Sequence, residues 1–531
     1  MAAKTYTADQ VAGHNVDGDL WTIINGDVYD LSRFAAMHPG GEGVLLDKDV
    51  AGKDSTDLFF SMHRSEVLQK YARYKIGTVA DYKGQTYIIP EPGALSVVPY
   101  GEPTWLTEPF KTPFFDDSHR ALQKQMRFFF DTFIKAEARE REISAERPSK
   151  EVYELLGSEK WEINAMRMGP GKHLEGRKLP GGVDPAKFNY FHELVVVQEL
   201  VRIGSPGYMA GINAGMVIGL PPVLNFGTPK MKSEVLPDIL RRVLSCWAET
   251  DFALTLGKKF ISLAISEAFA GSDVQGMTTT GVKSACGKYY TITGSKKWIT
   301  CGHYSDWFMT GVRTGNNKLS MFLIPRTEGV ETKIIKTSYS SAAGTAYVFF
   351  ENVKVPVENI LGGEGNGLKV ILSNFNHERW VICARIARFQ RFIVEECMKW
   401  VHLRKVAGKR LIDNAVIRQK LGKMIARVEG GQAWLEQLTF QMCSMPYEQQ
   451  SKHLAGPMAL LKLYLSRSQG EICDEAVQIF GGRGITQGGM GVYIEQAQRT
   501  FKFDSILGGS EEVLADLGVR QASKQMPKAV L

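Results

Sequence analysis

The sequence feature that most restricts the fold is an uninterrupted helical pattern from Trp380 to Leu403. Charged or histidine side chains recur every three or four positions along it, and mostly Val, Ile, Ala, Phe, Met and Trp lie between them. No Gly or Pro interrupts the pattern before Gly408. Such spacing predicts a long amphipathic helix with one solvent-facing stripe. The stripe would consist of Arg385, Arg388, Arg391, Glu395, Lys399 and His402.

The stretch just before this pattern, Asn374 to Trp380, contains a carboxylate with two competing explanations. Asn376 is a candidate N-cap, which would place Glu378 in the first helical turn, where the helix dipole favours a negative charge. Glu378 is then either a member of a capping box or a catalytic base. Taken alone, the stretch favours the cap.

Length and composition predict a soluble, multidomain α+β protein. A chain of 531 residues is too long for one core, and 44% apolar with 23% charged residues is typical of globular proteins. The net charge of +7 is small, and the basic residues are dispersed, so no nucleic-acid partner is expected. The seven cysteines form no C-x-x-C pair, which indicates a reduced, intracellular protein.

Targeting and membrane signals are weak. The first residues contain neither an apolar secretory segment nor an Arg-rich presequence. The uncharged run Ile203–Pro229 is broken by Gly and Pro residues, so we expect a buried helix and no membrane span. The final residues Ala529-Val530-Leu531 lack the basic residue of a peroxisomal tripeptide. A cytoplasmic or peroxisomal location is therefore the expectation.

The first eighty residues carry a hairpin signal and two notable histidines. The strand-like runs Leu20–Ile24 and Val28–Leu31 are joined by Asn25-Gly26-Asp27, which predicts a β-hairpin. His38 precedes Pro-Gly-Gly on a turn, and His63 follows 25 positions later among aromatic residues. Two neutral imidazoles can fill both axial positions of a haem iron, which suits electron transfer.

Residues 4–80 resemble cytochrome b5. The resemblance implies that His38 and His63 are the axial ligands of haem b in a soluble electron-transfer module. The matching motifs are Tyr6-Thr7-Ala8-Asp9-Gln10-Val11, Tyr29-Asp30-Leu31-Ser32-Arg33-Phe34, His38-Pro39-Gly40-Gly41 and Ala51-Gly52-Lys53-Asp54-Ser55-Thr56.

Beyond this segment the pattern changes several times. Pro-rich residues 83–112 predict a semi-extended linker, and residues 113–260 are mainly helical in pattern. Residues 261–360 contain short alternating runs typical of a β domain, and residues 361–531 are again helical. After the haem segment, which is expected at residues 1–82, and the linker, we therefore predict a helical domain, a β domain and a second helical domain.

Two stretches of the β domain are candidates for a cofactor site. Ala264–Asp273 reads as a strand that ends in a loop of small residues, where a flat ligand or a phosphate can approach backbone N–H groups. Gly294–Thr300 reads as a turn that leads into a strand containing Trp298. Either stretch alone is more simply explained as a hairpin with a core tryptophan.

Together the two stretches resemble the flavin-contacting motifs of the acyl-CoA dehydrogenases, which run roughly Thr-Glu-Pro-x-Ala-Gly-Ser-Asp and Gly-x-Lys-x-Trp-Ile-Thr. The resemblance covers about residues 113–520 and implies three parts: an α-helical N-terminal domain, a middle β-barrel-like domain and a C-terminal four-helix bundle. Further matches are Phe226-Gly227-Thr228, Phe350–Pro356, Leu403-Arg404-Lys405 and Ala476–Gly484.

The resemblance also implies a set of FAD-contacting residues. Arg404, Gln478 and Gly482 would reach the FAD of a neighbouring subunit, so a homodimer or homotetramer is expected. Within one subunit the set is Ile265, Ser266, Gly271, Ser272, Trp298, Thr300 and Ser510.

This sequence departs from the common family pattern at the catalytic position. Gly508 stands where many members carry the catalytic Glu near the C-terminus. In isovaleryl- and long-chain-type enzymes a Glu-Arg pair instead precedes the flavin-binding Arg by 26 positions, as Glu378 precedes Arg404 here. The resemblance therefore implies that Glu378 is the base, Arg379 keeps it ionised, and the Gly508 N–H stabilises the enolate-like oxygen.

The expected reaction is dehydrogenation of an acyl-CoA to the trans-2-enoyl-CoA, with electrons relayed from FAD to the haem and an external partner. Three alternatives stay open: an acyl-CoA oxidase that uses O₂, a nitroalkane-oxidase-like flavoenzyme, and a non-catalytic flavin and haem binding protein. The acyl chain and the direction of electron flow are not encoded in readable motifs.

Overall fold

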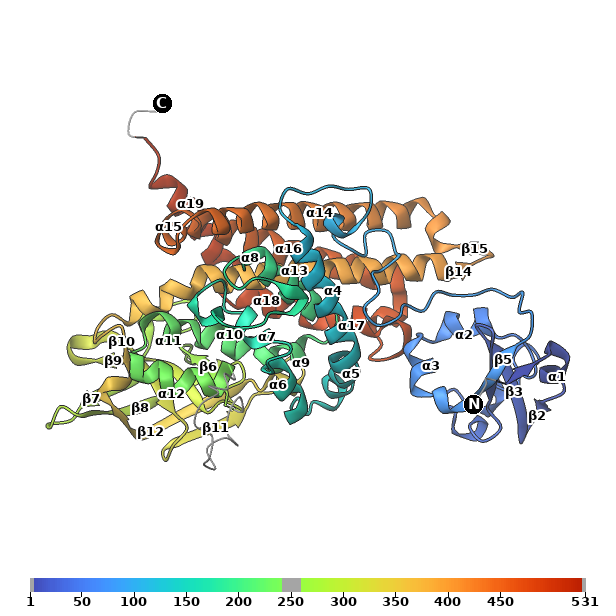
Figure 1. Ribbon diagram of the computed structural model, residues 1–531, viewed down its shortest axis with the longest axis horizontal. Helices are drawn as coiled ribbons and strands as arrows, with labels where there is room; N and C mark the ends of the chain where they lie inside the picture. The colour runs from blue at the N-terminus through green and yellow to red at the C-terminus, as the bar shows by residue number, and fades with distance from the viewer. Residues whose placement is uncertain (1–3, 241–258, 528–531) are drawn as a thin grey trace. The chain divides into compact units, whose positions relative to one another are not determined.

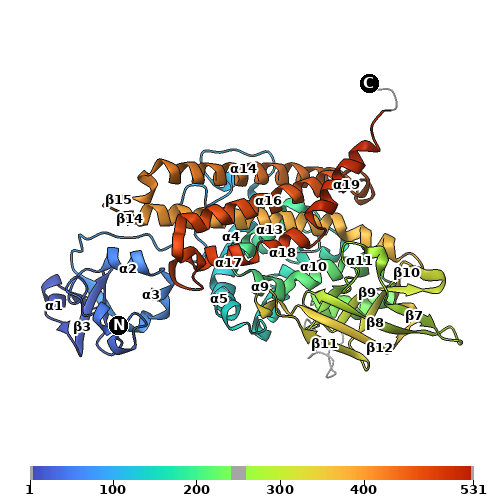
Figure 2. The same cartoon turned by 180° about the vertical axis from the view of Figure 1, so that it is seen from behind.

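The computed structural model describes residues 4–240 and 259–527, which form two compact units. The first unit contains residues 4–91, 396–420 and 476–496, and the second contains the remaining described residues from Pro92 onward. Residues 246–256, which have no recognisable counterpart in the acyl-CoA dehydrogenase pattern, lie outside the described residues. Figures 1 and 2 show the chain from opposite sides.

A five-stranded sheet forms the centre of the N-terminal part of the first unit. Its order is β1-β5-β4-β3-β2, and the expected hairpin joins β3 to β4. Asn25 and Gly26 both have positive φ (58° and 83°), as a tight two-residue turn requires. The elements are β1 (Thr5–Tyr6), α1 (Ala8–Ala12), β2 (Asn15–Val16), β3 (Asp19–Ile24), β4 (Asp27–Asp30), α2 (Thr56–Met62), α3 (Glu66–Lys70) and β5 (Lys75–Val79).

The second unit begins with a group of helices. Most of α8 is buried on every side, so its charged and polar residues need partners inside the protein. The helices are α4 (Asp117–Phe129), α5 (Lys135–Ser144), α6 (Lys150–Leu156), α7 (Ile163–Met166), α8 (Tyr190–Val201), α9 (Pro206–Met209), η8 (Ala210–Ala214), α10 (Gly215–Gly219), α11 (Pro221–Phe226) and α12 (Pro229–Leu240).

An eight-stranded sheet follows in the order β11-β12-β8-β7-β9-β10-β13, with β6 paired to β9. Side chains such as Tyr290, Phe308, Phe322 and Val348 are fully buried in its core. The first of the two candidate cofactor stretches is mostly loop, because β6 ends at Ala264. The strands are β6 (Ile261–Ala264), β7 (Thr280–Lys283), β8 (Tyr289–Ile299), β9 (Trp307–Thr314), β10 (Lys318–Pro325), β11 (Val330–Ile334), β12 (Ala346–Pro356) and β13 (Ile360–Leu361).

Long helices complete the chain, and α13, α14 and α16 run side by side in both views (Figures 1 and 2). Trp380 Nε1 of α13 donates to Thr439 Oγ1 of α14 at 2.8 Å. Gln390 Nε2 of α13 donates to the Leu465 carbonyl of α16 at the same distance. The elements are α13 (Gly367–Leu403), β14 (Lys405–Val406), β15 (Lys409–Arg410), α14 (Ala415–Ser444), α15 (Tyr447–His453), α16 (Ala455–Phe480), α17 (Val492–Thr500), α18 (Lys502–Ile506) and α19 (Glu511–Ser523).

Helix α13 corrects the expectation that Asn376 is an N-cap. The helix begins at Gly367, so Glu378 lies about three turns inside it. Asn376 instead donates its side-chain amide to the Gln450 carbonyl at 3.2 Å. The capping explanation of Glu378 is therefore wrong.

The predicted solvent-facing stripe of α13 is also wrong for most of its length. Arg388, Arg391 and Glu395 are only 2%, 1% and 7% exposed. Their partners lie largely in residues 92–102, in the middle of the predicted linker. Ser96 donates to Glu395 at 2.8 Å, and Arg391 Nη1 donates to the Glu102 carbonyl at 3.0 Å. A segment packed in this way is not a free spacer.

Glu102 is the centre of a buried charge network in the second unit. Arg127 of α4 binds Glu102 at 2.9 Å and Glu199 of α8 at 2.6 Å, and Arg388 of α13 lies 3.3 Å from Glu102. Burial alone would raise the pKa of Glu102, but the positive charges of Arg388 and Arg127 outweigh it and lower that pKa. The network joins α4, α8 and α13.

Among the described residues, no single helix is long and apolar enough to cross a membrane. One bent pair, Pro206–Ile212 with Gly215–Phe226, meets that test by length and composition only. The six cysteines in the described ranges are free, and four of them are buried.

Replacing Arg127 by Met should destabilise the protein, because two buried carboxylates would lose their shared cation. Breaking a buried ion pair from one side costs about 3–5 kcal/mol. The matched control is Lys124→Met, which changes an exposed position on the same helix and should leave the melting temperature almost unchanged. Equal melting temperatures for the two variants would show that the network does not stabilise the fold.

Candidate active site

Glu378 faces a cavity of about 50 Å³ in the second unit. Because a single water needs about 10–15 Å³ by this measure, the cavity can hold a small organic group. Thr300, from the second candidate cofactor stretch, lines the same cavity. The full lining is Arg167, Ala210, Val217, Ile218, Thr300, Tyr339, Glu378, Val381, Ile382, Arg385, Phe503 and Leu507.

The Glu378 carboxyl group is in a setting that favours proton uptake. Its side chain is partly exposed, and Oε2 has no hydrogen-bond partner among the described residues. Burial raises the pKa of Glu378 above its ordinary value, although the positive charges of Arg379, Lys462 and His377 oppose the rise. A carboxylate with a raised pKa and an unused oxygen can act as a general base.

Arg379 and Gly508 lie beside Glu378. Arg379 Nε donates to the Gly508 carbonyl at 2.9 Å, which links α13 to the loop after α18. Gly508 has φ of +66°, and a Cβ at this position would lie 2.7 Å from Ile382 Cδ1 and 3.8 Å from Glu378 Oε1. A Cβ at 508 would therefore clash with Ile382, while its distance to the Glu378 carboxyl group is an ordinary van der Waals contact.

A buried contact orients the residue before Glu378. His377 Nε2 lies 2.9 and 3.0 Å from the two carboxyl oxygens of Glu193, which is fully buried on α8. This pair has no signal in the sequence. The two residues are 184 positions apart, and Glu193 lies in a helix without a motif.

The two candidate cofactor stretches are directly joined. Lys297 N of β8 donates to the Ser266 carbonyl at 2.9 Å. Glu267 fixes the loop that contains Ser266. Its carboxylate accepts hydrogen bonds from Lys296 Nζ at 2.8 Å and from the main-chain N–H and hydroxyl groups of Thr278 and Thr279. The Lys296 side chain is fully buried. The sequence predicts Ser266 as a ligand contact, but no motif indicates the supporting role of Glu267 and Lys296.

The surface at this junction is suited to a flat ligand. Trp298 has φ of +61° and remains 45% exposed, despite its large apolar ring. Gly271 has open space around its Cα, and Ser272 is exposed. Ile265 is buried at the start of the loop, directly after β6. An uncovered aromatic ring beside a small-residue loop is typical of a binding surface.

In the first unit, the structure brings His38 and His63 together. Their ring centroids are 6.0 Å apart, with an angle of 86° between the planes. A metal–imidazole bond is about 2 Å long, so two imidazoles on one metal place their centroids about 6 Å apart. His38 Nδ1 lies 3.2 Å from the Gly41 carbonyl, a contact that orients the ring.

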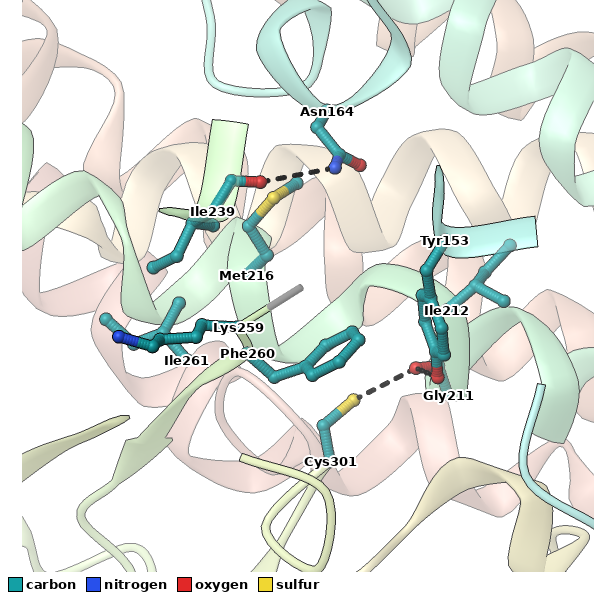
Figure 3. A pocket seen from close by; sticks show the side chains of 10 residues that line it. All are labelled: Tyr153, Asn164, Gly211, Ile212, Met216, Ile239, Lys259, Phe260, Ile261 and Cys301. Carbon is teal, nitrogen blue, oxygen red and sulfur yellow. Dashed lines mark hydrogen bonds between the residues drawn. The ribbon is translucent and has the colours of Figure 1, made fainter. Parts of the chain in front are cut away.

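A second cavity, of about 20 Å³, is shown in Figure 3. Asn164 Nδ2 donates to the Ile239 carbonyl at 3.4 Å, and Cys301 Sγ donates to the Gly211 carbonyl at 3.5 Å. Burial raises the pKa of the Cys301 thiol to about 11, so it is not a reactive thiolate at neutral pH. We assign no chemistry to this cavity.

Comparison with known families matches the second unit and much of the C-terminal chain to three successive domain profiles. They are described as acyl-CoA dehydrogenase N-terminal domain (residues 116–242), middle domain (262–353) and C-terminal domain (365–523). The chain belongs to the acyl-CoA dehydrogenase family. Residues 7–80 match a cytochrome b5-like haem/steroid binding domain, so the expected fusion is confirmed.

Two fungal relatives resemble this acyl-CoA dehydrogenase over most of its length. Acyl-CoA dehydrogenase apdG of Emericella nidulans is 35% identical, over 81% of this chain and 96% of that protein. Acyl-CoA dehydrogenase AFT10-1 of Alternaria alternata is 31% identical, over 81% and 97%. The structure of butyryl-CoA dehydrogenase from Megasphaera elsdenii has the same fold, with a TM-score of 0.65 and 22% identity over 78% of this chain and all of that chain.

The expected cofactors of this dehydrogenase, FAD and haem b, are supported by its family and by the geometry. The Trp298 surface and the Gly271 loop fit a flat ring with a phosphate tail. The facing histidines fit an iron with two axial imidazoles, and the ring edges of Phe34 and Phe59 lie close to them.

The remaining predicted FAD contacts lie elsewhere in the described chain. Arg404, Gln478 and Gly482 belong to the first unit, where Trp400 and Phe480 stack with ring centroids 5.1 Å apart and bring the ends of α13 and α16 together. Ser510 precedes α19 in the second unit. The part that these four residues play remains a prediction.

Replacing Gly508 by Ala should slow flavin reduction by an acyl-CoA. The left-handed backbone conformation costs a residue with a side chain about 1–2 kcal/mol, and the new Cβ would press on Ile382 Cδ1 beside Glu378. The double variant Gly508→Ala/Ile382→Val lacks that methyl group and should recover part of the rate of flavin reduction. Gly422→Ala, at an open site on α14, is the control. Stopped-flow flavin absorbance measures all four proteins, and an unchanged rate in Gly508→Ala would contradict the close packing.

Proposed function

We propose that this acyl-CoA dehydrogenase converts an acyl-CoA thioester to the trans-2-enoyl-CoA, with Glu378 as the base that removes the α-proton. The main support is the position of Glu378: its carboxyl group, with one oxygen unpaired among the described residues, faces a cavity that Thr300 also lines. The proposed base and Thr300 of the second candidate cofactor stretch thus line the same cavity.

The cavity supplies the conditions that this reaction needs. A thioester α-proton is weakly acidic, so its removal requires a positioned base and little competing water. Val217, Ile218 and Val381 supply apolar lining, and burial raises the pKa of Glu378. The α-proton passes to Glu378 while the β-hydrogen leaves with its electron pair. FAD, when bound, supplies the acceptor for that hydride.

We assign supporting roles to Arg379 and Gly508. The positive charge of Arg379 favours the ionised form of Glu378, and its bond to the Gly508 carbonyl holds the following loop in place. The Gly508 N–H is our candidate donor to the thioester oxygen, where negative charge develops as the proton leaves.

The FAD would be held mainly by the two joined stretches of the β domain. Arg404, Gln478 and Gly482 are proposed to act on the FAD of a neighbouring subunit, which makes a homodimer or homotetramer the functional form. The proposed contacts within one subunit are Ile265, Ser266, Gly271, Ser272, Trp298, Thr300 and Ser510.

We further propose that electrons leave the flavin through the haem to an external partner. The facing pair His38 and His63 would occupy both axial positions, which suits outer-sphere transfer and leaves no open position for O₂. This favours a dehydrogenase over an oxidase, because an oxidase would not need the haem.

The Glu378→Gln variant should bind FAD but lose flavin bleaching by acyl-CoA under anaerobic conditions. Removing a general base slows a reaction by about 10²–10⁴-fold. In the wild type the rate should rise with pH through a pKa above the ordinary Glu value, because only ionised Glu378 accepts the proton. Glu448→Gln, on the exposed side of α15, is the control. Undiminished bleaching in Glu378→Gln would place the base elsewhere.

If the haem accepts electrons, anaerobic mixing with acyl-CoA should produce the reduced haem band after the flavin bleaches. In Glu378→Gln the band should not form, while dithionite should still reduce the haem. Flavin bleaching without haem reduction in the wild type would refute the relay and leave the dehydrogenase assignment intact.

A further inference from the structure

Arg167 is a buried cation in the wall of the Glu378 cavity. It lies at the C-terminal end of α7 and is 3% exposed. Its Nε and Nη1 atoms have no hydrogen-bond partner among the described residues. Since buried charges in folded proteins are normally paired, this guanidinium group requires an explanation.

The charged groups near Arg167 leave its Nε and Nη1 atoms without a hydrogen bond. Glu193 attracts it, but both oxygens of that carboxylate already contact His377. Arg385 repels it, and the guanidinium of Arg385 lies 3.4 Å from Asp504. Burial, which outweighs the attraction of Glu193, lowers the pKa of Arg167 to about 9. The protein therefore holds a buried guanidinium with two unbonded nitrogens beside its proposed reaction site.

The other parts of the cavity wall match an acyl chain with a polar end. Val217, Ile218 and Val381 offer apolar contacts, whereas Arg167, Arg385 and Tyr339 offer groups that can donate hydrogen bonds. A purely hydrocarbon chain would satisfy the first set and leave the Arg167 guanidinium without a partner, which is unfavourable in a dry site.

We propose that Arg167 recognises a carboxylate on the acyl group, so that the substrates are CoA thioesters of dicarboxylic acids. The planar guanidinium can bind a carboxylate through two parallel hydrogen bonds. Arg167 is thus a specificity-determining residue in the cavity that contains the base. This inference rests on the proposed dehydrogenase function and names its substrate class.

The test compares matched pairs of thioesters on the full-length holoenzyme. Hexanoyl-CoA is paired with adipoyl-CoA and octanoyl-CoA with suberoyl-CoA, so that each pair differs only in the terminal group. Anaerobic flavin bleaching gives kcat/KM for each. The wild type should prefer the dicarboxylic member of at least one pair by 10-fold or more, because a desolvated, hydrogen-bonded charge pair is worth at least that factor.

Arg167→Met should abolish this preference, with a loss on the order of 100-fold for the dicarboxylic thioester. Its effect on the monocarboxylic thioester should be small. Arg167→Lys keeps the charge but not the paired donors and should retain part of the preference. The control Lys172→Met removes an exposed cation that follows closely in the chain and should behave as wild type.

FAD content and melting temperature are measured for every variant. Arg167→Met should keep its FAD and be at least as stable as the wild type, since replacing an unpaired buried ion by an apolar residue removes a desolvation penalty. Loss of FAD would assign Arg167 to the cofactor and overturn the inference. An equal fall in activity on both members of a pair would also overturn it.

The wild-type result separates failure of this inference from failure of the proposed function. If monocarboxylic thioesters bleach the flavin and dicarboxylic ones are no better, the dehydrogenase function stands and the role of Arg167 is refuted. If no thioester bleaches the flavin, the dehydrogenase function itself fails.

Discussion

The geometry around Glu378 depends on a buried network in which Arg127 binds both Glu102 and Glu199. The network joins α4 and α8 to the segment that precedes them, and Arg388 extends it to α13. With α8 and α13 held together, Glu193 of α8 meets His377 of α13, the residue just before the proposed base. The ion pairs of this network thus help to fix the position of the Glu378 carboxylate. A buried ion pair adds little net stability compared with apolar packing. Separating its two charges inside the protein costs much free energy, so the ion pairs disfavour shifted arrangements of the helices.

Arg167 contrasts with this network in a way that connects structure to function. Every arginine of the network contacts a carboxylate, whereas Arg167 has two buried nitrogens without partners among the described residues. All three arginines are buried, so the difference is not one of surface exposure. A buried guanidinium with unbonded nitrogens lowers the stability of the fold, so a functional role would explain why it is present. This contrast is why we explain Arg167 by substrate binding rather than by packing.

Much of the fold could be predicted from the sequence, and the errors have physical causes. The histidine pair, the hairpin of β3 and β4 and the long helix were recognisable, because each depends on local periodicity or on a short motif. The turn predicted at Gly294 was wrong, because Gly294 lies inside the continuous strand β8. The solvent-facing stripe of α13 failed because periodicity shows that charges share a face but not what covers the face. Its partner Glu102 is 286 positions from Arg388, in a Pro-rich segment with no pattern of its own. Glu193 and Arg167 were missed for the same reason: each owes its role to distant chain segments. The N-cap at Asn376 failed because α13 begins earlier, at Gly367.

The relation between Glu378 and Gly508 explains how one fold can carry its base at either of two places. The positions lie on separate segments, yet a Cβ at 508 would be 3.8 Å from the Glu378 carboxyl oxygen and would strike Ile382. A Glu side chain at 508 would bring a second carboxylate close to Glu378, and the repulsion between them would favour protonation of one. A Glu on α13 therefore requires a small residue in the loop, and a Glu in the loop requires a small or neutral residue on α13. Glycine at 508 thus leaves room for the proposed base at 378, so this departure from the common family pattern is compatible with an active enzyme.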